Sequence, residues 1–250
     1  MIVSALKGGL GNMMFQIAAG YSTALNTQNE YRYTLDRWRC VTNYDISKYE
    51  ATIFKNIKKV SLNDISSDFQ LYADDEISYN PLPHFTNTKN VIIDGYFQSE
   101  SHFATNKEFV QNLFDVPENA KYADYAFMHF RRKDYLIHSN IHNNLPQKYY
   151  IDAMNVLRPK KLLILSDDIQ WCKENIKGTD IEFVEGTTDI EDLCIMRSCK
   201  KGAIIANSTF SWWGAWLAQP EKVIAPKQWF NQSSPIKNWS DIYVPSWITI

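Results

Sequence analysis

The chain has 250 residues, of which 45% are hydrophobic and 22% are charged, and its formal net charge at pH 7 is -2. These proportions are ordinary for a globular protein. The charge argues against general nucleic-acid binding, which requires a strongly basic surface, so any site for an anion must be local. No apolar run approaches the roughly 18 residues that span a bilayer, and we expect a cytoplasmic protein without a membrane span.

The first half of the chain predicts an α/β unit. Residues 2–6 are typical of a strand, and a glycine-rich turn and a helix with one apolar face follow them. Such a turn can bring backbone N–H groups close to an anion or a sugar, although the glycines can equally serve a tight turn alone. Further strands are expected at 31–36 and 91–98, and a helix is expected at 102–114.

After about residue 120 the pattern alternates regularly between strands and helices. Strands are expected at 125–130, 161–165, 181–184, 203–206 and 222–225. The helices between them begin at Pro146, after Asp168, at a capping box from Thr188 to Glu191 and after Asn207. Strands separated by helices form a parallel sheet with helices on both faces. We therefore predict two domains, at 1–120 and 121–250.

Polar residues follow several of these strands at the point where each strand ends. They lie at His129–Asp134, Ser166–Asp168, Glu185 and Asn207–Thr209. In open α/β sheets, ligands bind just outside these ends. Arg131 and Arg132 suit a diphosphate, because a guanidinium grips a phosphate with two parallel hydrogen bonds. The alternatives are a surface ion-pair cluster for the arginines and an ordinary helix cap for Ser208.

Patterns for a metal site are weak. The cysteines are Cys40, Cys172, Cys194 and Cys199. They form no Cys-x-x-Cys pair, and we expect free thiols in a reducing compartment. Asp167 and Asp168 are adjacent rather than spaced as Asp-x-Asp, and the histidines do not cluster. We predict no metal ion, and we expect Asp168 to cap the helix that follows it.

Three motifs resemble those of the α-1,2-fucosyltransferases of glycosyltransferase family 11. They are Gly8–Gln16 (GGLGNMMFQ), His129–Tyr135 (HFRRKDY) and Asn207–Trp216 (NSTFSWWGAW), the last followed by Val223–Lys227 (VIAPK). The sequence departs from the family pattern at Met13, where a glutamine is usual, and at Lys133, where a glycine is usual. The motifs extend over nearly the whole chain, so the resemblance applies to both predicted domains.

The resemblance implies an α/β, GT-B-like fold of two Rossmann-like domains facing a central cleft. Domain 121–250 would bind the donor, and domain 1–120 would lie on the acceptor side. The implied reaction is an inverting transfer of L-fucose from GDP-β-L-fucose to a hydroxyl of a glycan acceptor, such as the 2-hydroxyl of a galactose-like residue. It implies no metal and no further cofactor. The expected partners are therefore a GDP-sugar donor and a glycan, and not a nucleic acid.

Carried onto this chain residue by residue, the resemblance implies two catalytic groups. Arg131 would hold the β-phosphate as the glycosidic bond breaks, and Asp134 would orient the arginines. The general base is not identified; an acid or a histidine in the cleft could serve, and Asp134 and Asp36 are candidates. His129 and Asp192 would contact the guanine or ribose. The full set of donor contacts would be Gly11, Asn12, His129, Arg131, Asp167, Asp192, Asn207, Ser208, Thr209 and the amide of Phe210.

Three alternatives remain open at this point. The same machinery could use another GDP-linked 6-deoxyhexose, such as rhamnose. A nucleotide-binding hydrolase would release free sugar without an acceptor. A catalytically silent sugar- or nucleotide-binding module would bind its ligand without turnover.

Overall fold

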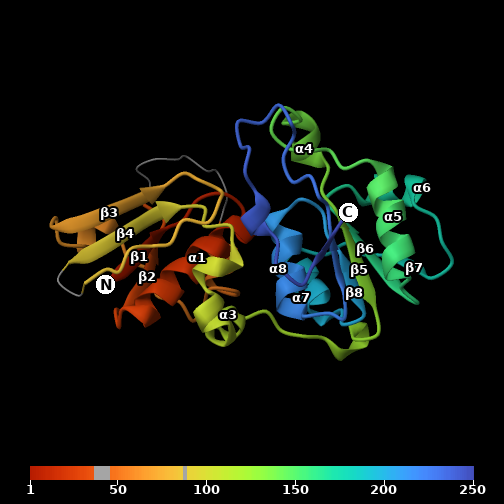
Figure 1. Ribbon diagram of the computed structural model, residues 1–250. Helices are drawn as coiled ribbons and strands as arrows, with labels where there is room; N and C mark the ends of the chain where they lie inside the picture. Colours follow the sequence, from red (N-terminus) through yellow and green to blue (C-terminus); the bar gives the residue numbers. More distant parts are fainter. Residues whose placement is uncertain (37–45, 87–88) are drawn as a thin grey trace. The chain divides into compact units, whose positions relative to one another are not determined.

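The computed structural model of the protein describes residues 1–36, 46–86 and 89–250 (Figure 1). Cys40 lies outside these described residues, and Cys172, Cys194 and Cys199 are free cysteines. The chain divides into two compact units, which are Met1–Asp115 with Ser240–Val244, and Val116–Trp239 with Pro245–Ile250. We describe each unit by itself.

The limits of these units differ from the predicted domains in two respects. The division falls between Asp115 and Val116 rather than at 120, and the segment Ser240–Val244 returns to the first unit. In that segment Ile242 is fully buried, and the carboxylate of Asp241 accepts the backbone N–H of Tyr79 at 2.9 Å. The segment is too short for a periodic pattern, so its place in the first unit has no signal in the sequence.

The N-terminal unit is built on a parallel sheet whose described strands follow the order β2-β1-β4-β3. The strands are β1 (Ile2–Ala5), β2 (Tyr31–Thr34), β3 (Phe69–Asp74) and β4 (Asn90–Gly95). Successive strand residues face opposite sides of a sheet. Ile2 therefore packs with Ala19 of helix α1 (Leu10–Asn26) on one side, and Val3 packs with Val60 on the other.

Short helical segments of this unit lie between β2 and β3 and after β4. They are α2 (Ser47–Glu50), α3 (Lys107–Leu113) and the 3-10 turns η1 (Leu62–Asp64), η2 (Glu100–His102), η3 (Ala104–Asn106) and η5 (Ser240–Ile242). The prediction of one helix over 102–114 is wrong, because two 3-10 turns precede α3. The side-chain amide of Asn106 donates to the Ser22 hydroxyl at 3.0 Å, and its backbone leaves the helical region. This anchor to α1 interrupts the helix.

The C-terminal unit contains a larger sheet whose described strands follow the order β10-β9-β8-β5-β6-β7. They are β5 (Ala126–Phe130), β6 (Leu162–Ser166), β7 (Ile181–Phe183), β8 (Gly202–Ile204), β9 (Val223–Ala225) and β10 (Ile248–Thr249). The pairs in this order are parallel, which confirms the predicted parallel sheet. The sequence does not predict β10, which has only two residues.

The helices of this unit begin close to the predicted positions. They are α4 (Lys133–Ile137), α5 (Gln147–Leu157), α6 (Ile169–Asn175), α7 (Asp189–Ser198) and α8 (Thr209–Ala218), with the 3-10 turn η4 (Ala120–Tyr122). The side chain of Asp168 accepts the N–H of Trp171 and so caps α6, and Thr188 and Glu191 form a capping box on α7. Both predictions are confirmed. The sequence analysis missed α4.

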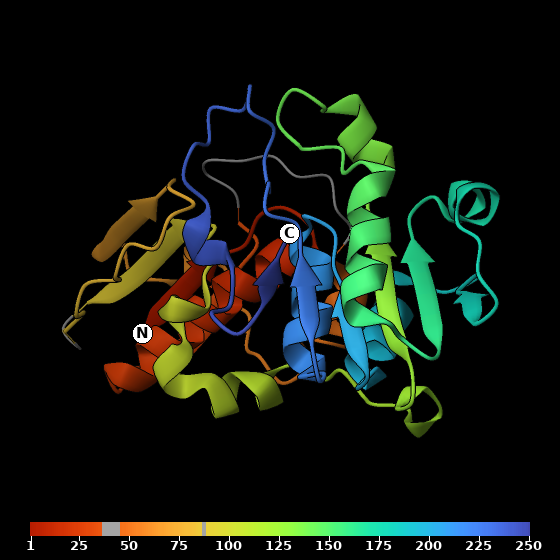
Figure 2. The same ribbon diagram turned by 45° about the vertical axis from the view of Figure 1, so that its right-hand side comes forward.

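Helices cover both faces of the C-terminal sheet (Figure 1, Figure 2). Met128 and Phe130 of β5 pack in one core cluster with residues of α5 and α6. Helices α7 and α8 lie on the other side and pack closely together, because a Cβ atom at Gly214 would lie only 2.8 Å from atoms of Met196. Trp212 and Trp213 of α8 are fully buried. This double layer leaves the strand ends as the place for chemistry.

Candidate active site

The chain reverses its direction of travel across the C-terminal sheet between β5 and β8. From β5 it moves to β6 and β7 on one side, and then to β8, β9 and β10 on the other. Ligands of open α/β sheets bind at such a switch point, outside the carboxyl ends of the strands. Arg131 follows β5 directly, and Ser208 follows β8 at the start of α8. The structure therefore brings two of the predicted donor-binding segments to the carboxyl ends of two neighbouring strands.

Arg131 is held between two carboxylates. Its Nη2 donates to Oδ2 of Asp134 at 2.8 Å, and its Nε lies 3.5 Å from Oδ2 of Asp167. Burial disfavours the charge, but the hydrogen bond to Asp134 and both carboxylates raise the pKa of Arg131 above its ordinary value. Its side chain remains 30% exposed. Arg131 is thus a permanently charged group with a fixed direction and access to a ligand.

Asp134 carries the opposite charge in this pair. Burial is the largest single influence and favours its neutral form, but the hydrogen bond from Arg131 and the charge of that guanidinium, with smaller contributions, together hold the pKa of Asp134 below its ordinary value. Its second oxygen, Oδ1, is buried without a hydrogen-bond partner within the described part of the chain. Asp134 therefore remains ionised near neutral pH and keeps Arg131 oriented.

Asp167 fastens the turn that carries the arginines. Its Oδ1 accepts the backbone N–H of Arg132 at 2.9 Å, and its Oδ2 accepts that of Lys133 at 3.2 Å. Burial raises the pKa of Asp167, and the nearby charge of Arg131 opposes that change. Both oxygens of Asp167 therefore serve the turn after β5. This residue was predicted to contact the donor, and its observed contacts are those of a support for Arg131.

The side chain of Arg132 follows a different course from that of Arg131. Its Nε donates to Oδ2 of Asp168 at 3.1 Å, and its guanidinium carbon lies 3.6 Å from the ring centroid of Trp171. Asp168 also caps α6, so this ion pair ties the turn after β5 to that helix. The sequence analysis interpreted the two arginines together as a grip for a diphosphate. The structure instead gives their side chains different partners.

The amino end of α8 lies at the same edge of the sheet, where the first turn of the helix presents backbone N–H groups. Ser208 is its N-cap, and the Ser208 hydroxyl accepts the N–H of Phe210 at 3.3 Å. Asn207 donates from Nδ2 to the carbonyl oxygens of Asn143 at 2.9 Å and Trp229 at 2.7 Å. Thr209 opens the helix, whose dipole favours an anion at this end. The Asn207 amide thus holds two loops, and the Ser208 hydroxyl caps α8, which is the alternative that the sequence left open for this residue.

Of the two residues predicted to contact the guanine or ribose, His129 is buried and Asp192 is partly exposed. Burial and the charge of Arg131 lower the pKa of His129 to about 3, so its ring is neutral. Its centroid lies 5.7 Å from that of Phe210, and its Nδ1 is buried without a partner among the described residues. Burial raises the pKa of Asp192 to about 6, and the Thr187 hydroxyl opposes this by donating to Oδ1 at 2.6 Å.

Gly11 and Asn12 lie in the first turn of α1, in the N-terminal unit. Gly8 just before them has φ +80°, and a Cβ atom there would meet Nδ2 of Asn12 at 2.6 Å, so the turn requires glycine. Gln98, which follows β4, donates to Oδ1 of Asn12 at 2.9 Å. Gln98 was not predicted as a site residue, although it lies at the end of the strand expected at 91–98.

A buried ion pair supports the same turn of the N-terminal unit. Lys7 Nζ donates to Oδ1 of Asp94 at 2.6 Å, and both residues are buried. Gln16 of α1 accepts the backbone N–H of Lys7 and donates to its carbonyl oxygen, each at 2.9 Å. Sequence reasoning missed this cluster. The only signal was a lysine and an aspartate at the ends of two apolar strands.

Asp36, one of the two candidates for the general base, follows β2. Its Oδ2 accepts the Ser61 hydroxyl at 2.8 Å and the backbone N–H of Leu62 at 2.5 Å. These contacts give it the role of a turn support in the N-terminal unit. They do not identify it as a base.

Across residues 1–36, 46–86 and 89–250, no group of three or more His, Cys, Asp or Glu side chains is arranged to hold a metal ion. Over the same ranges, no helix combines the length and apolar character needed to cross a bilayer. Metal independence stays a prediction.

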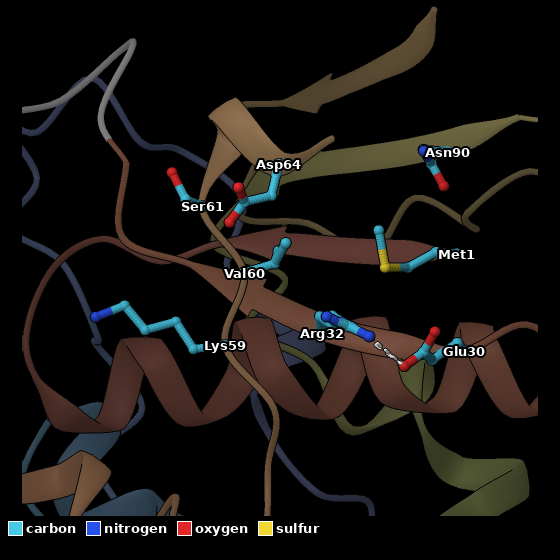
Figure 3. Close-up of a pocket in the computed structure, with 8 residues that line it drawn as sticks. All are labelled: Met1, Glu30, Arg32, Lys59, Val60, Ser61, Asp64 and Asn90. Carbon is cyan, nitrogen blue, oxygen red and sulfur yellow. Dashed lines mark hydrogen bonds and ion pairs between the residues drawn. The ribbon is translucent and has the colours of Figure 1, made fainter. Parts of the chain in front are cut away.

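Figure 3 shows a hollow in the N-terminal unit, and one of its lining residues, Ser61, donates to the predicted Asp36. The hollow is lined by Met1, Glu30, Arg32, Lys59, Val60, Ser61, Asp64 and Asn90. Met1, Glu30 and Asn90 lie at the amino ends of their strands, whereas ligands of parallel sheets bind at the carboxyl ends. Arg32 is paired with Glu30 at 2.8 Å. We therefore do not place the reaction here.

Comparison with known sequences extends over both units. A family model described as Glycosyl transferase family 11 matches residues 3–250. The chain is 28% identical to an Alpha-1,2-colitosyltransferase from Escherichia coli, over 93% of this chain and 93% of that protein. It is 22% identical to a Galactoside 2-alpha-L-fucosyltransferase from Caenorhabditis elegans, over 99% of this chain and 78% of that protein.

Comparison with solved structures concerns the fold. NodZ, an α-1,6-fucosyltransferase from Bradyrhizobium crystallised with GDP, superposes with a TM-score of 0.54 at 12% identity. The match covers 89% of this chain and 93% of that chain. Together with the two parallel sheets, it confirms the predicted α/β, GT-B-like class.

Proposed function

We propose that this chain, which belongs to glycosyl transferase family 11, transfers L-fucose from GDP-β-L-fucose to a hydroxyl of a glycan. The chain is a glycosyltransferase by its family, and the donor and acceptor are the proposed parts. The two relatives are named for an α-1,2 and a 2-α linkage, and one of them for a galactoside. These names support the 2-hydroxyl of a galactose-like residue as the acceptor group. Colitose is fucose without its 3-hydroxyl, which makes GDP-colitose the second donor candidate.

The observation that carries the proposal is the setting of Arg131. It stands at the switch point of the C-terminal sheet, partly exposed, and Asp134 and Asp167 fix its direction. A fixed guanidinium beside a helix amino end suits the oxygens of a diphosphate. Because these groups are oriented before the reaction, they stabilise the developing charge without reorganisation.

In the proposed reaction, the acceptor oxygen attacks C1 of the donor sugar on the face opposite the diphosphate, so the configuration at C1 inverts. The bond between C1 and the phosphate oxygen breaks, and its electron pair leaves with GDP. Arg131 and the turn at Ser208–Phe210 receive this negative charge. The acceptor hydroxyl loses its proton as the new bond forms. Because protein groups neutralise the leaving diphosphate, we propose that the reaction needs neither a metal ion nor another cofactor.

We assign Asp134 to the orientation of Arg131 rather than to removal of the acceptor proton. Its pKa is held below the ordinary value, which makes it a poor base at neutral pH. An inverting attack also brings the acceptor to the face of the sugar opposite the leaving group, whereas Asp134 pairs with the arginine proposed to hold that group. The proton acceptor is therefore a group other than Asp134.

Recognition of the guanine falls to Asp192 in this proposal. A carboxylate can accept hydrogen bonds from N1–H and the 2-amino group of guanine, and few other nucleobases offer two adjacent donors. The neutral His129 ring is proposed for a hydrogen bond to the ribose or base, and Gly11 and Asn12 for the sugar. Asp167 and Asn207 support the site through the turn and the loops they hold.

A donor panel with galactoside acceptors tests the proposal. Purified protein is incubated with GDP-fucose, GDP-colitose or GDP-rhamnose, with and without acceptor, and product linkage is read by NMR. We expect an acceptor-dependent α-1,2 product with GDP-fucose. Release of free sugar at the same rate without acceptor would support a hydrolase instead. GDP binding with no consumption of any donor would support a silent binding module.

A further inference from the structure

Tyr135 touches both halves of the candidate phosphate site. Its hydroxyl donates to the backbone carbonyl oxygen of Asn207 at 2.9 Å, directly before Ser208. The guanidinium carbon of Arg131 lies 5.7 Å from the centroid of the Tyr135 ring, within the range of a cation–π contact. Tyr135 therefore connects the segment after β5 with the segment after β8, across the switch point of the sheet.

A closed set of contacts holds the Tyr135 ring in place. The ring of His142 stacks on it with centroids 3.9 Å apart and planes 5° from parallel. Asn207, whose carbonyl oxygen receives the Tyr135 hydroxyl, donates from its side chain to Asn143 and Trp229. Asn143 is the chain neighbour of His142. The same asparagine thus secures both the hydroxyl of Tyr135 and the loop that stacks on its ring.

We propose that Tyr135 is a positioning residue that keeps Arg131 and the amino end of α8 at the spacing required by a diphosphate. The inference rests on the proposed use of a GDP-linked donor. Burial raises the pKa of the Tyr135 hydroxyl, so it stays protonated and continues to donate at working pH. Tyr135 acts through Arg131 and does not need to touch the donor.

The ratio of the dissociation constants for GMP and GDP measures how well Arg131 is positioned for the β-phosphate, and it therefore tests the role of Tyr135. Both nucleotides carry the same base, ribose and α-phosphate, and only GDP carries the β-phosphate assigned to Arg131. A fault in the position of Arg131 therefore weakens GDP binding and leaves GMP binding unchanged. A general loss of structure weakens both nucleotides together. The ratio of the two dissociation constants separates these cases.

The experiment measures both dissociation constants by calorimetry for the wild type, Tyr135→Phe and Tyr135→Leu. Loss of one hydrogen bond in Tyr135→Phe should lower the preference for GDP by about two- to tenfold, and Tyr135→Leu, which also loses the stack, should lower it further. Tyr149→Phe is the matched control. Its hydroxyl donates to the Ile205 carbonyl oxygen at 2.7 Å in the same unit, and its loss should leave the preference unchanged.

A second pair of variants shows that the effect passes through Arg131. In an Arg131→Lys background, where the fork of the guanidinium is gone, Tyr135→Phe should change the preference little further. His142→Ala, which removes the stack from a half-buried position, should lower the preference and provides the test if Tyr135→Leu does not fold.

The outcomes separate this inference from the function on which it rests. A wild type that binds GDP no better than GMP would overturn the proposed function. A wild type with a clear preference that Tyr135→Phe retains, or a variant that loses both nucleotides equally, would overturn the positioning role alone. Lower preference in Tyr135→Phe together with an unchanged Tyr149→Phe would support it.

Discussion

The guanidinium carbon of Arg132 lies 3.6 Å from the ring centroid of Trp171. Arg132 also pairs with Asp168, the cap of α6, at 3.1 Å. The preceding residue, Arg131, pairs instead with Asp134 and remains 30% exposed. The two neighbouring arginines therefore have different roles. Arg132 stabilises the fold, and Arg131 belongs to the candidate phosphate site.

Alanine at each arginine should separate these roles. Arg131→Ala should lower turnover by about 10²–10³ with little change in stability, because the charge that receives the diphosphate is lost. Arg132→Ala should lower the free energy of unfolding by about 1 kcal/mol with a smaller loss of turnover. Steady-state kinetics and chemical denaturation measure the two effects. Substantial turnover by a folded Arg131→Ala protein would refute its role.

Asp134→Asn tests the pairing that orients Arg131. Removal of the carboxylate relieves repulsion of the incoming diphosphate, which opposes the loss of affinity from a misdirected Arg131, so GDP affinity should fall less than turnover. Turnover should fall by about tenfold or more, because the guanidinium is no longer held in direction. Calorimetry and initial rates measure the two quantities. Equal loss of GDP affinity and turnover would show that Asp134 merely maintains the fold.

The carboxyl group of Asp192 predicts a pH dependence of nucleotide binding. Its pKa is raised to about 6 by burial, so it is ionised above that pH and protonated below it. Only the ionised form accepts both guanine N–H groups. GDP affinity should therefore be constant above about pH 7 and fall by about tenfold per pH unit well below the pKa.

Variants locate the source of that pH dependence. Asp192→Asn should weaken GDP at pH 7.5 and flatten the profile. Asp152→Asn, on a surface pair with Lys148 of α5, is the matched control and should keep the wild-type profile. Calorimetric titration between pH 5 and 8 gives both curves. A wild-type affinity that does not change over this range would exclude Asp192 from guanine recognition.

Transfer should persist in excess EDTA. Arg131 and the amino end of α8 supply the positive charge that a divalent cation would otherwise provide. Rates with EDTA should stay within about twofold of the untreated enzyme, and added Mg²⁺ or Mn²⁺ should not raise them. Initial rates under the three conditions give the answer. Complete loss of activity that a metal restores would overturn the proposed mechanism.

The sequence predicted the C-terminal sheet well because its strands are buried on both faces. Strands of this kind appear as continuous apolar runs between helices, and β5 and β6 follow that pattern. The parallel arrangement then predicted that the polar residues at the ends of these strands lie at one edge of the sheet. The close packing of α7 and α8 around Gly214 also agrees with the glycine and the tryptophans of the motif Asn207–Trp216.

The sequence could not predict which partner each polar side chain takes. Arg131 and Arg132 are the same residue type one position apart, and residues from other strands and helices decide their directions. Asn207 was predicted to bind the donor, yet its amide donors hold two loops that come from distant parts of the chain. Tyr135 belongs to the motif His129–Tyr135, but the motif does not reveal its partners, because its contacts join segments that only the fold brings together.

The return of Ser240–Val244 to the first unit has a consequence for how the protein is made. Domains generally fold as units during synthesis, beginning at the N-terminus. Here the first unit still lacks Ile242, a fully buried side chain, until synthesis has passed through the second unit as far as that residue. Truncation after residue 239 would therefore remove a buried side chain from the unit that is synthesised first, and should destabilise that unit.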